Sequence, residues 1–306
     1  MTRHAAMHSA LALAGCKKLF IDGGSNTGDA VDAFYRGSFH RCAKSSPNRL
    51  YGKIWHNASG REKAQRMAPL ADVQSWCVRS FEANPRLMPM LRAKGASHSS
   101  TGRNVRFVDG LLGTVTGPAV SRTVITYSRD PTGSGVSFFN FSRVHSRTVP
   151  VLATEKVLAP AYDVRDVVRR AREQSPGVII GMRLDVEGEE YSLLDALSTA
   201  GEDGSTLLCQ LSFLFVEHHN LHENMTWHGF PERMYNVVND RIHYLMDHEP
   251  GCKLQINWRN FWSSCGDSAR YVWMKSPQAT GRNVSEAATR RAAVSRGRRR
   301  GRRRHS

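Results

Sequence analysis

Short apolar runs alternate along this chain with stretches of helical spacing, and each of five apolar runs ends in an acidic residue. The runs cover residues 18–21, 78–81, 105–108, 177–184 and 211–216, and the residues that follow them are Asp22, Glu82, Asp109, Asp185 and Glu217. Helical spacing appears at residues 29–34, 86–94, 163–173 and 192–197. This alternation predicts an α/β fold, a doubly wound and mostly parallel sheet with the acids along its carboxyl edge.

Glycines crowd the end of the first apolar run. Asp22 is followed by Gly23 and Gly24, then by Asn26 and Gly28, and a helical stretch begins at once. Glycine permits positive φ and lets backbone approach a ligand closely, so this strand, turn and helix predict a nucleotide-like ligand at the sheet edge. The spacing differs from Gly-x-Gly-x-x-Gly, which binds a diphosphate at the helix N-terminus. An ordinary tight turn is the alternative interpretation.

The second apolar run ends in Glu82, and Asn84 and the strand-ending Pro85 come directly after it. An acid at this point of a doubly wound fold binds ribose hydroxyls and usually lies about 20 residues beyond the glycine turn. Here residues 37–75 intervene, with Pro47, Gly52, Gly60 and many basic residues among them. We predict that they form an insertion on the ligand-binding side.

These segments together resemble the FkbM family of methyltransferases, whose blocks appear here in the family's order over about residues 17–275. The most distinctive block runs from Leu184 to Tyr191 and contains Asp-Val-Glu-Gly-Glu-Glu-Tyr. The other matching blocks are residues 20–28, 81–85, 161–164 and 215–218. The resemblance implies a class I, Rossmann-like methyltransferase that uses S-adenosyl-L-methionine. Many family members methylate hydroxyl groups of sugars or secondary metabolites.

The resemblance also implies a seven-stranded sheet whose last strand is antiparallel. We expect residues 241–248 and 269–274 to be its sixth and seventh strands. Residues 122–127 predict a further strand, and residues 131–137 predict a loop rich in glycine and serine.

The resemblance implies that the cofactor lies along the sheet edge. Its turn would be formed by Asp22, Gly23, Gly24, Asn26 and Gly28. Glu82, with Asn84 beside it, is expected to bind the ribose hydroxyls, and Asp109 to face the adenine amino group. A turn residue that caps Gly110 is the alternative role for Asp109.

Asp185 and Glu187 come where the transferable methyl group is expected. Alternation along an extended chain puts both on one face. One would hold the methionine amino group, and the other would orient or deprotonate the acceptor. Alternatively, Glu187 and Glu189 cap the N-terminus of the following helix, which favours acids.

Glu217, His218 and His219 end the fifth run. A histidine beside a carboxylate is a good general base near neutral pH, so His218 is a third catalytic candidate. These residues could instead hold a divalent ion with Asp185 and Glu187, or be ordinary structural side chains. We predict no metal, because methyl transfer from a sulfonium does not require one.

The chain has 306 residues, 40% of them hydrophobic, which is enough for one sizeable core. We expect an N-terminal extension over residues 1–17, a methyltransferase domain over 18–278 and a tail over 279–306. No run reaches the roughly 18 apolar residues of a membrane span, so no transmembrane segment is expected. The expected partner is a small-molecule or glycan acceptor.

Positive charge is concentrated at the C-terminal end. Residues 282–306 hold ten arginines and one glutamate, in a chain with a formal net charge of +16. Such a segment repels itself and buries nothing, so we predict a disordered tail. Contact with nucleic acid or an anionic surface stays open, which makes a nucleic-acid-binding protein or an RNA methyltransferase the alternative function. The tail lacks the interleaved aromatic residues that stack on bases.

Cysteines and glycosylation motifs leave the compartment open. The six cysteines contain no Cys-x-x-Cys pair, which argues against a structural zinc site, and Cys252 and Cys265 could pair across a short loop. Asn-x-Ser/Thr motifs occur at Asn57, Asn140, Asn224 and Asn283. They favour a secretory lumen, where disulfides persist, whereas the absence of a signal sequence favours the cytoplasm.

Overall fold

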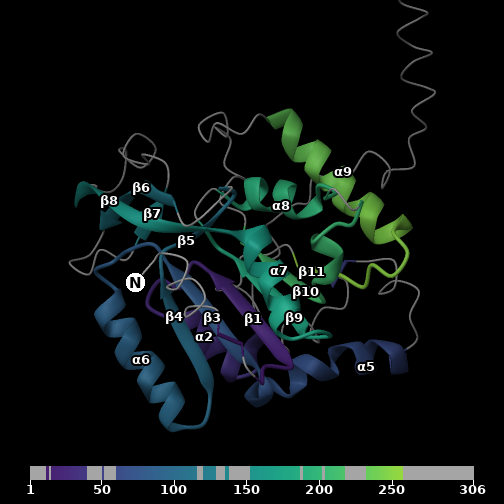
Figure 1. Cartoon of the computed structure of the whole chain (residues 1–306), viewed down its shortest axis with the longest axis horizontal. Helices are drawn as coiled ribbons and strands as arrows, with labels where there is room; N and C mark the ends of the chain where they lie inside the picture. The colour runs from purple at the N-terminus through teal and green to yellow at the C-terminus, as the bar shows by residue number, and fades with distance from the viewer. Residues whose placement is uncertain are drawn as a thin grey trace, which may run out of the picture. The chain divides into compact units, whose positions relative to one another are not determined.

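The computed structural model describes residues 12–13, 15–39, 50–51, 60–115, 120–128, 135–137, 152–186, 189–201, 204–217 and 232–257 (Figure 1). The fold is α/β, with a seven-stranded sheet in the order β2-β11-β10-β9-β1-β3-β4. Its strands are β1 (Lys18–Gly23), β2 (Leu50–Tyr51), β3 (Cys77–Glu82), β4 (Asn104–Asp109), β9 (Ile179–Leu184), β10 (Phe213–Val216) and β11 (Gln255–Asn257). All neighbours pair in parallel except β2, which runs antiparallel to β11.

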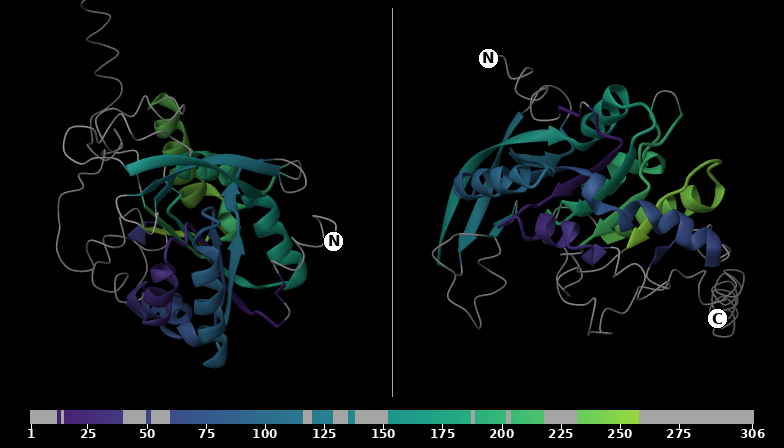
Figure 2. Two further views of the ribbon diagram at one scale, coloured as in Figure 1. Left: turned by 90° about the vertical axis from the view of Figure 1, so that its left-hand side faces the viewer. Right: turned by 90° about the horizontal axis from the view of Figure 1, so that it is seen from below.

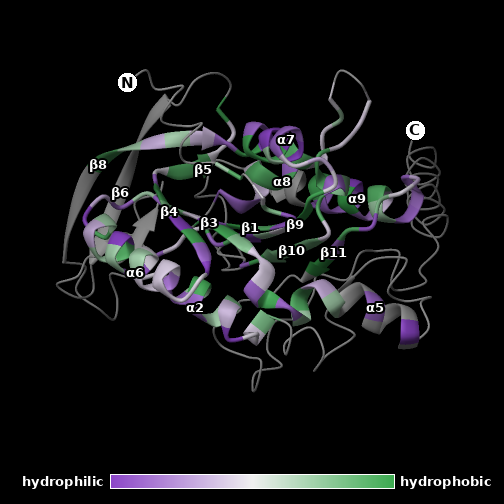
Figure 3. Cartoon of the chain, turned by 60° about the horizontal axis from the view of Figure 1, so that its bottom comes forward, coloured by the Kyte–Doolittle hydropathy of each residue, from purple (hydrophilic) through white to green (hydrophobic). Residues whose placement is uncertain are grey.

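Helices cover both faces of this sheet, as Figure 3 shows. One face carries α2 (Asp29–Tyr35), α5 (Gly60–Ala71) and α6 (Met88–Ser100), and the other carries α7 (Val164–Gln174), α8 (Glu190–Ser198) and α9 (Glu232–His248). The central strands are buried along their length, as expected for parallel strands covered on both sides.

The aromatic core lies between the sheet and α2. Phe20 of β1 stacks on Phe34 of α2, with ring centroids 4.2 Å apart, and Trp76 meets Phe34 edge-on at 5.6 Å. Leu70 and Val73 come from the predicted insertion and are buried in the same core. The later part of that insertion, α5 and η2 (Val73–Ser75), therefore contributes to packing.

The strand order of the sheet reverses at β1. β1 pairs with β3 on one side and with β9 on the other, and the rest of the sheet extends outward from these two pairs. Open α/β sheets bind ligands in the crevice outside the carboxyl ends of the strands at such a reversal. Residues at the ends of β1, β3 and β9 are therefore the ones that define the candidate site.

A second sheet of four strands follows β4 and was predicted only in part. Its order is β5-β8-β6-β7, from β5 (Leu111–Gly113), β6 (Val120–Ser128), β7 (Gly135–Ser137) and β8 (Leu152–Asp163). The long strands β6 and β8 run antiparallel beside each other (Figure 2). The predicted strand over 122–127 is confirmed within β6, whereas residues 135–137 of the predicted loop form β7.

One expectation about the final strands needs correction. Residues 241–248 are helical and end α9, because Val238, Ile242 and Leu245 recur at helical spacing and are all buried. The sixth parallel strand is β11, beyond that helix. Among the described residues the antiparallel strand is β2. The antiparallel last strand expected over 269–274 lies outside them and stays a prediction.

Disulfides join strand ends at the amino edge of the sheet. Cys16 pairs with Cys77 and Cys209 with Cys252, with Cα–Cα distances of 5.9 and 4.6 Å. The pairing of Cys252 with Cys265 was therefore wrong. Cys252 precedes β11 and comes close to Cys209, which precedes the neighbouring β10.

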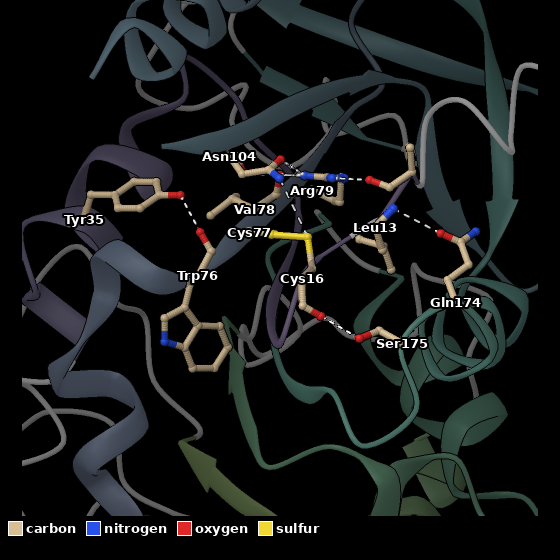
Figure 4. The surroundings of a disulfide bond; sticks show 11 residues. Leu13, Cys16, Tyr35, Trp76, Cys77, Val78, Arg79, Asn104, Gln174 and Ser175 are labelled. Atoms are coloured by element: carbon tan, nitrogen blue, oxygen red, sulfur yellow. Dashed lines mark hydrogen bonds between the residues drawn. A yellow bond between two sulfur atoms is a disulfide. The ribbon is translucent and has the colours of Figure 1, made fainter. Parts of the chain in front are cut away.

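The Cys16–Cys77 bond belongs to a compact anchor for the segment before β1 (Figure 4). Leu13 N donates to Gln174 Oε1 at 3.0 Å, and Ser175 Oγ donates to Cys16 O at 2.6 Å.

Within the part of the chain that the structure describes, no helix is long and apolar enough to cross a membrane.

Candidate functional site

The turn after β1 reaches across to the end of β3. The amides of Gly24 and Ser25 both donate to Phe81 O, at 3.1 and 2.9 Å. Asn26 has φ 49°, which makes it the one non-glycine residue with positive φ among the described residues. Gly28 has φ 78° and is the N-cap of α2. The predicted strand, turn and helix are confirmed at these residues.

The glycines of the turn are required by neighbouring parts of the fold. A Cβ added to Gly24 would lie 1.8 Å from the carbonyl oxygen of Asp185, and one added to Gly28 would lie 2.8 Å from Lys94 Cδ. At Gly23 the nearest atom would be Leu112 Cδ1 at 3.0 Å. The glycine pattern therefore reports close packing of the turn against β9, α6 and β5. That packing accounts for the glycines without a ligand.

Asp22 is fully buried and has partners on both of its oxygens. Ser80 Oγ donates to Oδ2 at 2.6 Å, and Arg183 Nη1 donates to Oδ1 at 2.9 Å. Burial raises the pKa of Asp22, and the Arg183 charge and the Ser80 hydrogen bond act in the opposite direction. Asp22 is therefore placed behind the turn, where it holds side chains of β3 and β9.

Arg183 belongs to this site although the sequence pattern did not indicate it. Its guanidinium is 1% exposed and contacts Asp22, Asp185 and the carbonyl of Gly24, the last at 3.0 Å. Burial alone would lower the pKa of Arg183, but the surrounding carboxylates outweigh it and raise the pKa. A single charge inside an otherwise apolar strand, two residues before Asp185, was the available signal.

Glu82 ties the second strand to the glycine turn. Its Oε2 accepts from Asn26 N at 2.6 Å, and its Oε1 accepts from Asn84 N at 2.8 Å. Burial raises the pKa of Glu82 to about 8, although these two amides lower it. Asn84 is also buried, and its Oδ1 accepts from Arg86 N at 3.1 Å.

Asp109 lies directly beside Glu82, because the two residues are partners in the register of β3 and β4. Burial raises the pKa of Asp109, and the charge of Arg92 opposes this effect. The backbone carbonyl of Asp109 accepts from the hydroxyl of Tyr162, at 3.4 Å. The tip of β4 therefore extends the row of acids that begins at β1.

Asp185 and Glu217, which follow β9 and β10, both lie near Nη2 of Arg183. Asp185 N donates to Gly23 O at 2.9 Å, and Glu217 N donates to Leu184 O at 2.8 Å. Glu217 Oε2 is 3.8 Å from Arg183 Nη2. The other two catalytic candidates, Glu187 and His218, lie outside the described residues.

The helix-capping alternative is answered only for Glu189. Glu189 is the N-cap residue of α8 but makes no side-chain capping hydrogen bond. Instead the fully buried Glu190 accepts from Val186 N at 3.1 Å, a contact that the sequence did not indicate. No group of three metal-binding side chains occurs among the described residues.

The site therefore brings together acids from four strand ends: Asp22 of β1, Glu82 of β3, Asp109 of β4 and Asp185 after β9. Asp22 and Glu82 are buried, whereas Asp109 and Asp185 are partly exposed and can bind hydroxyl groups or cations at the carboxyl edge of the sheet. A comparison with protein-family models, with curated proteins and with solved structures finds no match for this chain.

Proposed function

We propose that this protein is an S-adenosylmethionine-dependent methyltransferase that methylates a hydroxyl group of a glycan or a small molecule. The observation that carries the proposal is the row of acids at the ends of β1, β3, β4 and β9, on both sides of the point where the sheet reverses. The strand order β4-β3-β1-β9-β10 suits a class I, Rossmann-like methyltransferase.

The charge of the site suits such a cofactor. Asp22, Asp185 and Glu217 surround the buried guanidinium of Arg183, so three carboxyl groups face one positive charge. S-adenosylmethionine carries a sulfonium and an ammonium, and buried carboxylates favour cations over neutral groups. The cofactor supplies an activated methyl group when it is bound.

Each strand end has its own role in this proposal. Glu82, with Asn84 beside it, binds the ribose hydroxyls, and Asp109 lies on the adenine side. Asp185 receives the ammonium group. The acceptor hydroxyl needs a base within hydrogen-bond reach, and the candidates are Glu187 and His218, which follow β9 and β10 in the sequence. Holding the two reactants in line lowers the barrier by several kcal/mol, up to about 7–11 in ideal cases.

Thermal unfolding with and without S-adenosylmethionine tests the proposal. A ligand that binds only the folded state raises the midpoint as its concentration increases. We expect this rise in the wild type and its loss in Asp22→Asn. Asp72→Asn is the matched control, because Asp72 pairs with Lys18 on the surface at 2.9 Å. No rise in the wild type would contradict the proposal.

The acceptor class is tested with a methyl-labelled cofactor. Candidate glycans and metabolites are incubated with the protein and analysed by mass spectrometry, and we expect the label on a hydroxyl oxygen. Label found on RNA would instead favour the RNA methyltransferase. The ten arginines of residues 282–306 are the observation that supports this alternative.

A further inference from the structure

Arg183 links three neighbouring strand ends through one guanidinium. Nη1 donates to Asp22 Oδ1 at 2.9 Å and to Gly24 O at 3.0 Å, while Nη2 contacts Asp185. Glu217 Oε2, after β10, is 3.8 Å from Nη2. A planar guanidinium with donors fixed in a fork is suited to hold several acceptors at defined angles, which a lysine ammonium cannot do.

The partners of Arg183 differ in their access to solvent. The side chain of Asp22 is 0% exposed and that of Glu217 is 8% exposed, whereas that of Asp185 is 14% exposed. Asp22 and Gly24 therefore hold the guanidinium from behind. Asp185 is the most exposed of these three carboxylate partners.

A second buried arginine shows what a purely structural role looks like. Arg79 is 2% exposed and lies near the amino edge of the sheet, on β3 (Figure 4). Its donors go to neutral oxygens: Val78 O at 2.9 Å, Asn104 Oδ1 at 3.0 Å and Ala12 O. Burial lowers the pKa of Arg79 to about 10. Arg183 is instead surrounded by carboxylates at the carboxyl edge.

We infer that Arg183 is a positioning residue, which is anchored by Asp22 and Gly24 and holds Asp185 where it receives the ammonium group of the methionine part of the donor. This inference rests on the proposed function. It assigns Arg183 to the amino-acid end of the donor and gives it no contact with the nucleoside end. The nucleoside end belongs to Glu82 and Asp109, whose carboxyl groups have no ion pair with Arg183.

The test compares two ligands that differ at that end and in the charge on sulfur, which is a sulfonium in the first and a neutral thioether in the second. S-adenosylmethionine carries the amino-acid group, whereas 5′-methylthioadenosine has the same nucleoside without it. We expect Arg183→Lys to bind S-adenosylmethionine on the order of tenfold more weakly, since it loses a hydrogen bond between charged groups. Its affinity for 5′-methylthioadenosine should stay within about twofold of wild type. S-adenosylhomocysteine, a neutral thioether that keeps the amino-acid group, is measured beside them and should show the same loss as S-adenosylmethionine. Dissociation constants are measured by calorimetry.

Arg79→Lys is the matched control, because it alters an equally buried arginine away from the site. It should change stability and leave the affinities for both ligands unchanged. Arg183→Gln is the second variant and decides the outcome if Arg183→Lys does not fold. It retains side-chain donors without the charge.

Equal losses for both ligands in the Arg183 variants would show a general structural role and overturn the inference, as would no loss for either. A wild-type chain that binds 5′-methylthioadenosine but gains nothing from the amino-acid group would overturn it too. A wild type that binds neither ligand contradicts the proposed function itself, so the two failures are distinguishable.

Discussion

Individual residues at the rim are held by contacts that tolerate little change. Gly24 has φ 97° and lies against the backbone of Asp185, so its missing side chain lets the turn after β1 meet the end of β9. Asn26 adopts φ 49° and donates its amide to Glu82. Strained backbone of this kind concentrates at functional sites and persists where surrounding contacts fix it.

Gly24→Ala should therefore be much more damaging than the same change at Gly102. Both glycines have positive φ, which costs alanine about 1–2 kcal/mol. Gly102 has open space around it, whereas a Cβ at Gly24 would overlap a backbone oxygen. We expect the free energy of unfolding to fall by about 1–3 kcal/mol more for Gly24→Ala. Urea unfolding of both variants measures this, and equal losses would contradict the packing described here.

Glu82 makes stability depend on pH. Its pKa is about 8 in the folded protein and has an ordinary value of 4.5, so unfolding releases a proton between these two values. The stability of the wild type should then fall as the pH rises through that window. Glu82→Gln cannot ionise, so its free energy of unfolding should fall less steeply there. Glu173→Gln, at an exposed position, should keep the wild-type slope.

At the scale of elements, the two edges of the sheet have separate tasks. The carboxyl ends of β1, β3, β4 and β9 carry the acids, whereas both described disulfides join segments at the amino ends. Cys16 and Cys77 are 1% and 6% exposed, so this bond is shielded from reductants. Disulfides of this kind persist in oxidising compartments.

Removing the Cys16–Cys77 bond should cost stability and leave the site intact. The bond spans 61 residues, and closing a loop of that size removes unfolded-state entropy worth about 4 kcal/mol. We expect the Cys16→Ser/Cys77→Ser variant to unfold at clearly lower urea concentration than wild type. The folded variant should still bind S-adenosylmethionine with wild-type affinity, which calorimetry measures. A large loss of affinity in folded protein would contradict the separation of the two edges.

The sequence predicted the central elements because their patterns are local. Apolar runs ending in Asp22, Glu82 and Asp185 identify buried strands, and their order predicts which ends meet. It misassigned residues 241–248, where a short apolar segment without its preceding helical turns can be interpreted as either element. Arg183 was missed because its role depends on strands that are adjacent only in the fold.

For the molecule as a whole, the arginine-rich segment and the candidate site lie in different parts of the chain. The candidate site is acidic, whereas residues 282–306 carry ten of the arginines in a chain with a formal charge of +16. These arginines lie outside the described residues. Under the proposed function these arginines are not needed to bind S-adenosylmethionine.

Deletion of residues 282–306 should leave the affinity for S-adenosylmethionine unchanged. It should also remove most of any salt-dependent binding to RNA, because such binding depends on the number of phosphates neutralised. Filter binding at several salt concentrations measures the second effect. If the deletion weakened the binding of S-adenosylmethionine as much as it weakened the binding of RNA, the result would favour the RNA methyltransferase, in which tail and site act together.

The central claim is that the strand ends around Arg183 bind S-adenosylmethionine. Calorimetric titration of the full chain with this compound tests the claim most directly. The account predicts saturable binding of one molecule per chain, lost in Asp22→Asn and retained in Asp72→Asn. Absence of binding by folded wild-type protein, or binding that Asp22→Asn leaves unchanged, would contradict it.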